Sequence, residues 1–242
     1  MTGAAPQTPR TYVFVPGAWH GGWCFRNVAR LLRRAGHEVH ALTLTGLGER
    51  AHLAHPGITL DTHIQDVIGL LDMEELEGVV LVGHSYGGCV ISGVVVQRPA
   101  AIGTLVYLDA IVLRDGECLF DQLDPVFQAA LREDAAANGD GYKLSNPTMA
   151  FLGVDPEHAP WMERRLTPHP IGTATQRLAA ATPDPAVPRV FIDCDSPSIP
   201  PLATTKARLR HASGWTMHTL HTGHDPFVTA PDALAELLGR IG

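Results

Sequence analysis

Residues 79–90 read VVLVGHSYGGCV. The apolar, β-branched beginning is typical of a buried strand, and it ends where Gly83, Gly87 and Gly88 surround Ser85. The residues that follow, CVISGVVVQR, have the pattern of a buried helix. A G-x-S-x-G sequence on such a strand–turn–helix corner presents the serine hydroxyl above the carboxyl ends of the strands. The stretch therefore predicts an α/β fold with Ser85 as a nucleophile.

Similar apolar runs recur along the whole chain and alternate with stretches of helical spacing. The runs predict strands at residues 11–15, 38–44, 78–83, 104–109, 189–193 and 216–221. Apolar residues at helical spacing predict helices around residues 28–35, 64–71 and 234–241. This alternation favours an α/β protein whose mainly parallel sheet is flanked by helices.

The alternation stops between about residues 114 and 188, where helix-like patches are interrupted by proline and glycine. Structureless loops of that length are uncommon inside compact domains. We therefore expect a helical cap inserted before the penultimate strand. The rest of the chain predicts one domain over residues 11–242, preceded by a flexible tail at residues 1–10.

Composition restricts the partners and the compartment. The net charge is −7 with 18 Lys and Arg residues, so neither nucleic acid nor a membrane is an expected partner. The N-terminal MTGAAPQTPR has no apolar core of signal-peptide length, and no later apolar run approaches the length of a membrane span, which predicts a cytoplasmic protein. The four cysteines lack metal-ligand spacing, and we expect no metal and no organic cofactor. The oligomeric state is left open, with a homodimer as one option.

A serine hydroxyl needs a base within hydrogen-bond reach, and the base needs an orienting carboxylate. His224 lies in LHTGHDPF, between the last strand and the last helix, and is the predicted base. The carboxylate should follow the penultimate strand, where Asp195 is the first residue clearly past the strand. Asp195 is therefore the preferred acid. Asp193 in the same segment and Asp109, which ends its own strand, are the alternatives.

The first predicted strand runs into a glycine-rich loop, VPGAWHGGW, at residues 15–23. Its backbone amides point toward the same edge of the sheet as the serine corner, so we expect the N–H groups of Ala18 and Tyr86 to form an oxyanion hole. A dinucleotide site is the alternative for such a loop, but the G-x-G-x-x-G spacing is absent.

Four segments resemble a known family: GAWHGGWCF, LLRRAGHEVHALTLTGLGE, VVLVGHSYGG and the late GHDPF. They resemble the α/β-hydrolases, and within them the small serine esterases of the pyrethroid-hydrolase and plant methylesterase/hydroxynitrile-lyase branch. The likeness spans most of the chain outside the cap and implies the α/β-hydrolase fold. It implies Ser85 as nucleophile, His224 as base, Asp195 as acid, and the amides of Ala18 and Tyr86 as the oxyanion hole.

The chain departs from this branch in two ways. Pro16 stands where many members have a histidine, which leaves the backbone donors of the loop available. The plant lyases have a threonine at the position of Gly17 and a lysine at that of Asp225, groups associated with handling cyanide. Their absence disfavours cyanohydrin cleavage and favours ester hydrolysis.

The resulting hypothesis is a serine carboxylesterase that cleaves an ester of a fairly apolar small molecule through an acyl-enzyme. The expected pocket lining comes from apolar cap residues: Leu119, Phe120, Leu123, Val126, Phe127, Phe151, Leu152, Trp161 and Met162. A biosynthetic thioesterase, lactonase or cyclase would use the same triad. A non-hydrolytic lyase or a ligand-binding protein on the same scaffold is the remaining alternative. An epoxide or haloalkane hydrolase would need an aspartate in place of Ser85.

Overall fold

A parallel sheet forms the centre of the molecule. The computed structural model describes residues 8–179 and 187–241. The main sheet has the order β2-β1-β3-β4-β7-β8, and all its pairings are parallel. The six strands of this sheet are β1 (Thr11–Val15), β2 (Glu38–Ala41), β3 (Val79–His84), β4 (Ile102–Leu108), β7 (Arg189–Cys194) and β8 (Thr216–Leu220). All the predicted strands are confirmed to within a few residues. The predicted tail, residues 1–10, lies mostly outside the described residues.

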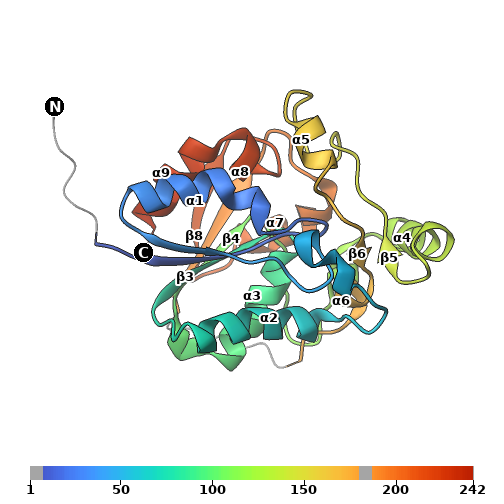
Figure 1. Ribbon diagram of the computed structural model, residues 1–242, viewed down its shortest axis with the longest axis horizontal. Helices are drawn as coiled ribbons and strands as arrows, with labels where there is room; N and C mark the ends of the chain where they lie inside the picture. The colour runs from blue at the N-terminus through green and yellow to red at the C-terminus, as the bar shows by residue number, and fades with distance from the viewer. Residues whose placement is uncertain (1–7, 180–186, 242) are drawn as a thin grey trace.

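Helices cover both faces of the sheet because parallel strands need crossover connections. One face carries α1 (Arg26–Arg34), α8 (Pro226–Thr229) and α9 (Pro231–Arg240). The other carries α2 (Leu60–Met73) and α3 (Gly87–Gln97), seen below the sheet in Figure 1. The predicted α/β architecture is therefore confirmed.

The four inner strands β1, β3, β4 and β7 contribute to two separate cores because their side chains alternate between the faces. In β1, Tyr12 and Phe14 pack into the core beneath α1 and α9, whereas Val13 and Val15 pack into the core beneath α2 and α3. All four side chains are fully buried. The two cores together hold the carboxyl ends of the strands in place.

A cap segment, residues 114–179, separates β4 from β7. It contains α4 (Pro125–Asn138), β5 (Lys143–Leu144), α5 (Ala159–Glu163), β6 (His169–Pro170) and α6 (Gly172–Thr175). It lies at the carboxyl ends of the strands, on the right in Figure 1. The antiparallel pair β5–β6 was not predicted, because strands of two residues leave no alternating pattern in the sequence. Residues 180–186, within the predicted cap, lie outside the described residues.

After β7 the chain forms α7 (Ala203–Leu209) before entering β8. Among the described residues, no helix has both the length and the apolar character that crossing a bilayer would require.

We expect the substitution Phe191→Ala to lower the free energy of unfolding by about 3 to 5 kcal/mol, because the ring is fully buried in β7 and its loss leaves a cavity. Urea denaturation measures the change. Met73→Ala is the control: its side chain is 80% exposed, so a change within about 0.5 kcal/mol is expected. Equal losses in both variants would contradict this assignment of the core.

Candidate active site

Ser85 lies on the tight corner that joins β3 to α3. Its φ of 52° falls in the left-handed region, which is costly for a residue with a side chain. Two hydrogen bonds tie the strained backbone to residues outside the corner: the Ser85 N–H donates to the carbonyl of Leu108 at 3.2 Å, and its carbonyl accepts from the Ile111 N–H at 3.0 Å. The neighbouring strand β4 and the chain that follows it therefore fix the corner.

The glycines of the corner are required by close backbone contacts. A Cβ atom on Gly83 would lie 2.6 Å from the carbonyl oxygen of Gly87, and one on Gly87 would lie 2.5 Å from that of Val15. A side chain at Gly17 would meet the Cβ of Ser85 at 2.9 Å. Contacts below 3.0 Å are not tolerated, so the sequence G-x-S-x-G is dictated by packing. The close approach of residue 17 to the Cβ of Ser85 also leaves no room for the threonine that the plant lyases have at this position.

His224 is joined to a buried carboxylate, and that carboxylate belongs to Asp109. His224 Nδ1 lies 2.7 Å from Asp109 Oδ2, and Asp109 is fully buried. An ionised carboxylate only accepts hydrogen bonds, so Nδ1 carries the hydrogen and Nε2 keeps its lone pair. Burial alone would raise the pKa of Asp109, but the hydrogen bond and charge of His224, with the charge of Lys206, hold that pKa below its usual value.

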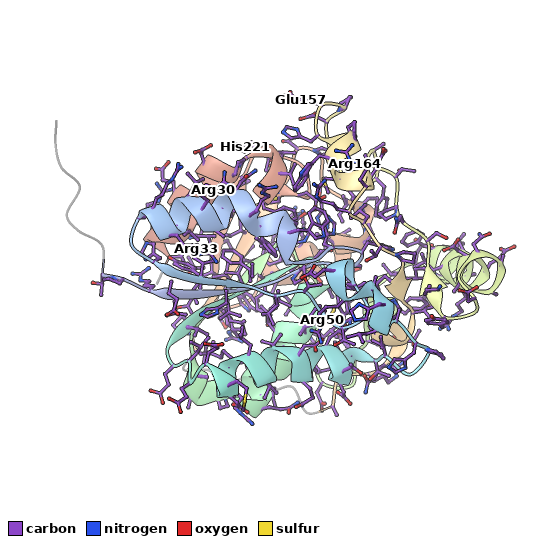
Figure 2. The ribbon with its side chains drawn as sticks, viewed as in Figure 1. Arg30, Arg33, Arg50, Glu157, Arg164 and His221 are labelled. Atoms are coloured by element: carbon purple, nitrogen blue, oxygen red, sulfur yellow. The ribbon has the colours of Figure 1, made fainter. Side chains whose placement is uncertain are left out.

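Asp195, the preferred acid of the sequence analysis, does not contact His224. Its carboxylate lies 3.0 Å from Nδ1 of His221, whose side chain is 81% exposed (labelled in Figure 2). The prediction of Asp195 as the partner of His224 is therefore wrong in this structure. The reason lies in the strand order: β4 is adjacent to β3, which carries the serine corner, whereas β7 is one strand farther away. The alternative residue Asp109, at the end of β4, takes this place.

Asp193, the other alternative, lies in β7 and faces a lysine. The Lys206 Nζ of α7 lies 2.6 Å from Asp193 Oδ1 and 2.8 Å from Asp109 Oδ1. Lys206 is only 5% exposed. The sequence alone does not reveal this position, because a basic residue in the segment TTKARLR carries no sign of burial.

Ser85 and His224 line one cavity between the sheet and the cap segment, together with Ala18 and Tyr86. Most of its wall is apolar, with side chains from Ile111, Leu119, Leu123, Phe127, Leu131, Leu144, Phe151, Leu152, Ala174, Ile199 and Pro201. Five of the predicted lining residues are in this set. The other four are elsewhere: Phe120 packs inside the cap segment, Trp161 and Met162 join the core near α1, and Val126 is 79% exposed.

Residues 17–20 form the loop that faces Ser85, and its backbone is held from two sides. Trp19 has a φ of 67°. Its N–H donates to His169 Nδ1 at 3.4 Å, and its carbonyl accepts from the Thr167 N–H at 3.1 Å, so the cap segment binds both of its polar groups. From the other side, His20 Nδ1 donates to the Ala18 carbonyl at 2.8 Å. These bonds fix the peptide group between Ala18 and Trp19. The Gly17 carbonyl, which shares a peptide group with the Ala18 N–H, accepts from the His20 N–H at 3.3 Å, so this group is fixed as well.

Two buried histidines beside the cavity are held neutral by their surroundings. Burial, and next the nearby His224, lower the pKa of His84 to about 3. Burial likewise lowers the pKa of His169 well below its usual value. The Thr173 hydroxyl donates to the Pro170 carbonyl and so accepts from His169 Nε2, 2.7 Å away. The Nδ1 of His169 is therefore free to accept the Trp19 N–H.

One group near the cavity has the residue types of a metal site. His84, His224 and Asp225 each place one potential ligand atom within 4.8 Å of the others. Two of these groups already serve other contacts: His224 Nδ1 contacts Asp109, and His84 Nε2 donates to the His224 carbonyl at 2.9 Å. Burial would raise the pKa of Asp225, but His20, and then His84 and His224, hold it below its usual value. A metal ion here would have to compete with these contacts.

Comparison with known proteins identifies the family. The model of the alpha/beta hydrolase family matches residues 12–237. The chain belongs to the alpha/beta hydrolase family. A carbendazim hydrolyzing esterase of Nocardioides sp. (strain SG-4G) is 40% identical over 96% of this chain and 99% of its own length. A pyrethroid hydrolase of Sphingobium wenxiniae is 25% identical over 96% of this chain and 87% of its own.

Solved structures show the same alpha/beta hydrolase fold. An extracellular alpha/beta-hydrolase from a Paenibacillus species superposes with a TM-score of 0.86 at 22% identity, covering 97% of this chain and 99% of that one. A methylesterase from Arabidopsis superposes with a TM-score of 0.77 at 22% identity, covering 95% and 97%. The predicted fold and branch are confirmed, and the esterase relatives confirm the class of a carboxylesterase-type serine hydrolase.

We expect Asp109→Asn to lower kcat by about 10,000-fold, because the amide cannot hold the His224 ring in the tautomer that leaves Nε2 unprotonated. Asp195→Asn is the matched control, with kcat within about twofold of the parent, because this carboxylate contacts only surface groups. Steady-state kinetics on any turned-over ester measure both, with thermal melts to show that the variants fold. A large loss in Asp195→Asn with an active Asp109→Asn would reverse the assignment.

Proposed function

We propose that the protein hydrolyses a carboxylic ester of a fairly apolar small molecule through an acyl-enzyme on Ser85. The observation that carries the proposal is the shared cavity. Ser85 on its strained corner and His224, oriented by the buried Asp109, both line it. A nucleophile, a base and an orienting carboxylate are the groups that acyl transfer needs.

The proposed reaction has two halves. His224 Nε2 takes the proton of the Ser85 hydroxyl while Oγ attacks the ester carbonyl, and the resulting imidazolium is stabilised by Asp109. The tetrahedral intermediate expels the alcohol, which receives this proton from His224. His224 then takes a proton from a water molecule, which attacks the acyl-enzyme. The carboxylic acid leaves, and the proton returns to Ser85.

The N–H groups of Ala18 and Tyr86 are the proposed oxyanion donors. Both residues line the cavity beside Ser85. Among the backbone hydrogen bonds of the turns and loops in the described residues, none has the N–H of Ala18 or of Tyr86 as its donor. Tyr86 precedes α3, so its amide also lies at the positive end of that helix. The fixed Ala18 peptide and the helix start together supply donors that need no rearrangement when the oxyanion forms.

The apolar wall of the cavity supports an apolar substrate, and the closest chemical indication comes from a relative. The 40% identical protein is named for hydrolysing carbendazim, a methyl carbamate of an aromatic heterocycle. We therefore propose small aromatic methyl esters and methyl carbamates as the first substrates to test. Carbamate hydrolysis would use the same attack by Ser85 and the same expulsion of an alcohol.

The cytoplasmic location and the homodimer stay predictions. The four cysteines are all buried and free, which fits a reducing compartment.

We expect a fluorophosphonate probe to label the parent protein and not Ser85→Ala, which should lose at least about 10,000-fold in kcat. A panel of p-nitrophenyl esters, methyl esters, thioesters and carbendazim then identifies the acyl group, and a burst of p-nitrophenol reveals the acyl-enzyme. A folded parent protein that neither reacts with the probe nor turns over any member of the panel would contradict the proposed function. Turnover of thioesters alone would favour the biosynthetic alternative.

We expect His169→Leu to lower kcat about tenfold to a hundredfold with little change in KM, because losing the acceptor of the Trp19 N–H loosens a loop that acts on the transition state. His169→Asn keeps an acceptor oxygen near the place of Nδ1 and should restore much of kcat. The affinity of a boronic acid inhibitor should fall in parallel with kcat. An increase in KM alone would show that His169 only shapes the pocket.

A further inference from the structure

Asp109 belongs to a largely buried cluster of charges whose other members, Lys206 and Asp193, have no part in the proposed reaction. Its Oδ2 accepts the hydrogen bond of His224, whereas its Oδ1 lies 2.8 Å from Lys206 Nζ and accepts the Cys194 N–H at 3.2 Å. The two oxygens thus serve different partners. One faces the catalytic base and the other anchors the carboxylate to α7 and β7.

Lys206 is held in place by four oxygen atoms. Besides Asp109, its Nζ lies 2.6 Å from Asp193 Oδ1 and donates to the Cys194 carbonyl and the Ser198 hydroxyl, each at 2.9 Å. Burial would lower the pKa of the ammonium, but Asp109, and then Asp193, raise it above its usual value. Lys206 therefore carries a positive charge next to the carboxylate that orients the base.

A lone ammonium in this position would work against the base. His224 becomes an imidazolium when it takes the serine proton, and a positive charge next to Asp109 disfavours that step. The negative charge of Asp193, next to the ammonium, offsets the positive charge of Lys206. Asp109, Asp193 and Lys206 contribute charges of −1, −1 and +1, so these three groups together present one net negative charge to the base, which a protonated His224 balances. Asp225 is a separate carboxylate near the base and is the same in every variant below.

We propose that Lys206 and Asp193 are positioning residues of the active site: Lys206 fixes Asp109, and Asp193 offsets the lysine charge so that the base keeps its affinity for the proton. The inference rests on the proposed function and deepens it. Asp193 and Lys206 act through Asp109, and in the proposed reaction neither touches the substrate.

The other charged and titratable groups around the base stay the same in the test. The ring of His84 is tilted by 44° to that of His224, with ring centroids 4.6 Å apart, and burial keeps His84 neutral. Asp225 lies beside His84 and His20, at 3.5 Å from each ring. Burial, and next the charge of Asp109, raise the pKa of the Cys194 thiol, which remains uncharged. None of these residues is changed in the variants below.

The test is the pH profile of kcat/KM, whose acidic limb follows protonation of the free base. We expect Asp193→Asn to shift this limb by roughly one pH unit toward lower pH, because the negative charge that offsets Lys206 is lost. Lys206→Met should shift it in the opposite direction by a similar amount, because a positive charge is lost. The double variant keeps the net charge of −1 on Asp109 alone, so its limb should return close to that of the parent.

The combination separates electrostatics from structure. If Lys206 and Asp193 had only a structural role, their variants would lose activity. The acidic limb would not shift in opposite directions in the two single variants and return in the double variant. Lys206→Arg keeps the charge and serves as a second variant if Lys206→Met does not fold, and its limb should stay near that of the parent. Asp195→Asn is the surface control, with an unchanged profile.

The outcomes distinguish this inference from the proposed function. Unshifted limbs, or shifts of the same sign in both single variants, in an enzyme whose activity depends on Ser85 would overturn the roles of Lys206 and Asp193 alone. If Ser85→Ala retains the activity of the parent, the proposed function itself fails.

Discussion

The hydrogen bond between His224 and the buried carboxylate of Asp109 joins two parts of the chain that are 115 residues apart in sequence. It joins the loop after β8 to the end of β4, across the strand β7 that lies between them in the sheet. The same carboxylate is tied to α7 through Lys206 and to β7 through the Cys194 amide. The geometry of the candidate site thus depends on one ionised group that is held in a fully buried position.

The strands and the serine corner could be predicted because their signals are local. A run such as VVLVG is typical of a strand in a parallel sheet covered by helices on both faces. Gly83 and Gly87 are required by contacts within a few residues of Ser85 or with the adjacent strand. His224 could be placed for a similar reason, since it lies between the last strand and the last helical pattern. The cap segment could be recognised only by the absence of such signals.

The acid could not be chosen from the sequence because the choice depends on strand order. Asp109, Asp193 and Asp195 all lie at or just past the end of a strand. Their partners differ and are Lys206, His221 and His224. One local signal did favour Asp109: apolar residues flank it on both sides in VYLDAIV, which indicates burial, whereas Ser and Pro follow Asp195. The buried Lys206 had no such signal, because a lysine in a short helix reads as a surface residue.

The loop opposite Ser85 has a consequence for the evolution of new specificities in this scaffold. The N–H and the carbonyl of Trp19 are both bound by the cap segment, through His169 and Thr167. The part of the molecule that encloses the substrate is therefore also a support for the part that carries out chemistry. If the cap segment of a relative replaced this one, it would bring a new pocket wall. It would also leave the backbone of Trp19 without its partners, unless the new segment kept a donor in place of Thr167 and an acceptor in place of His169.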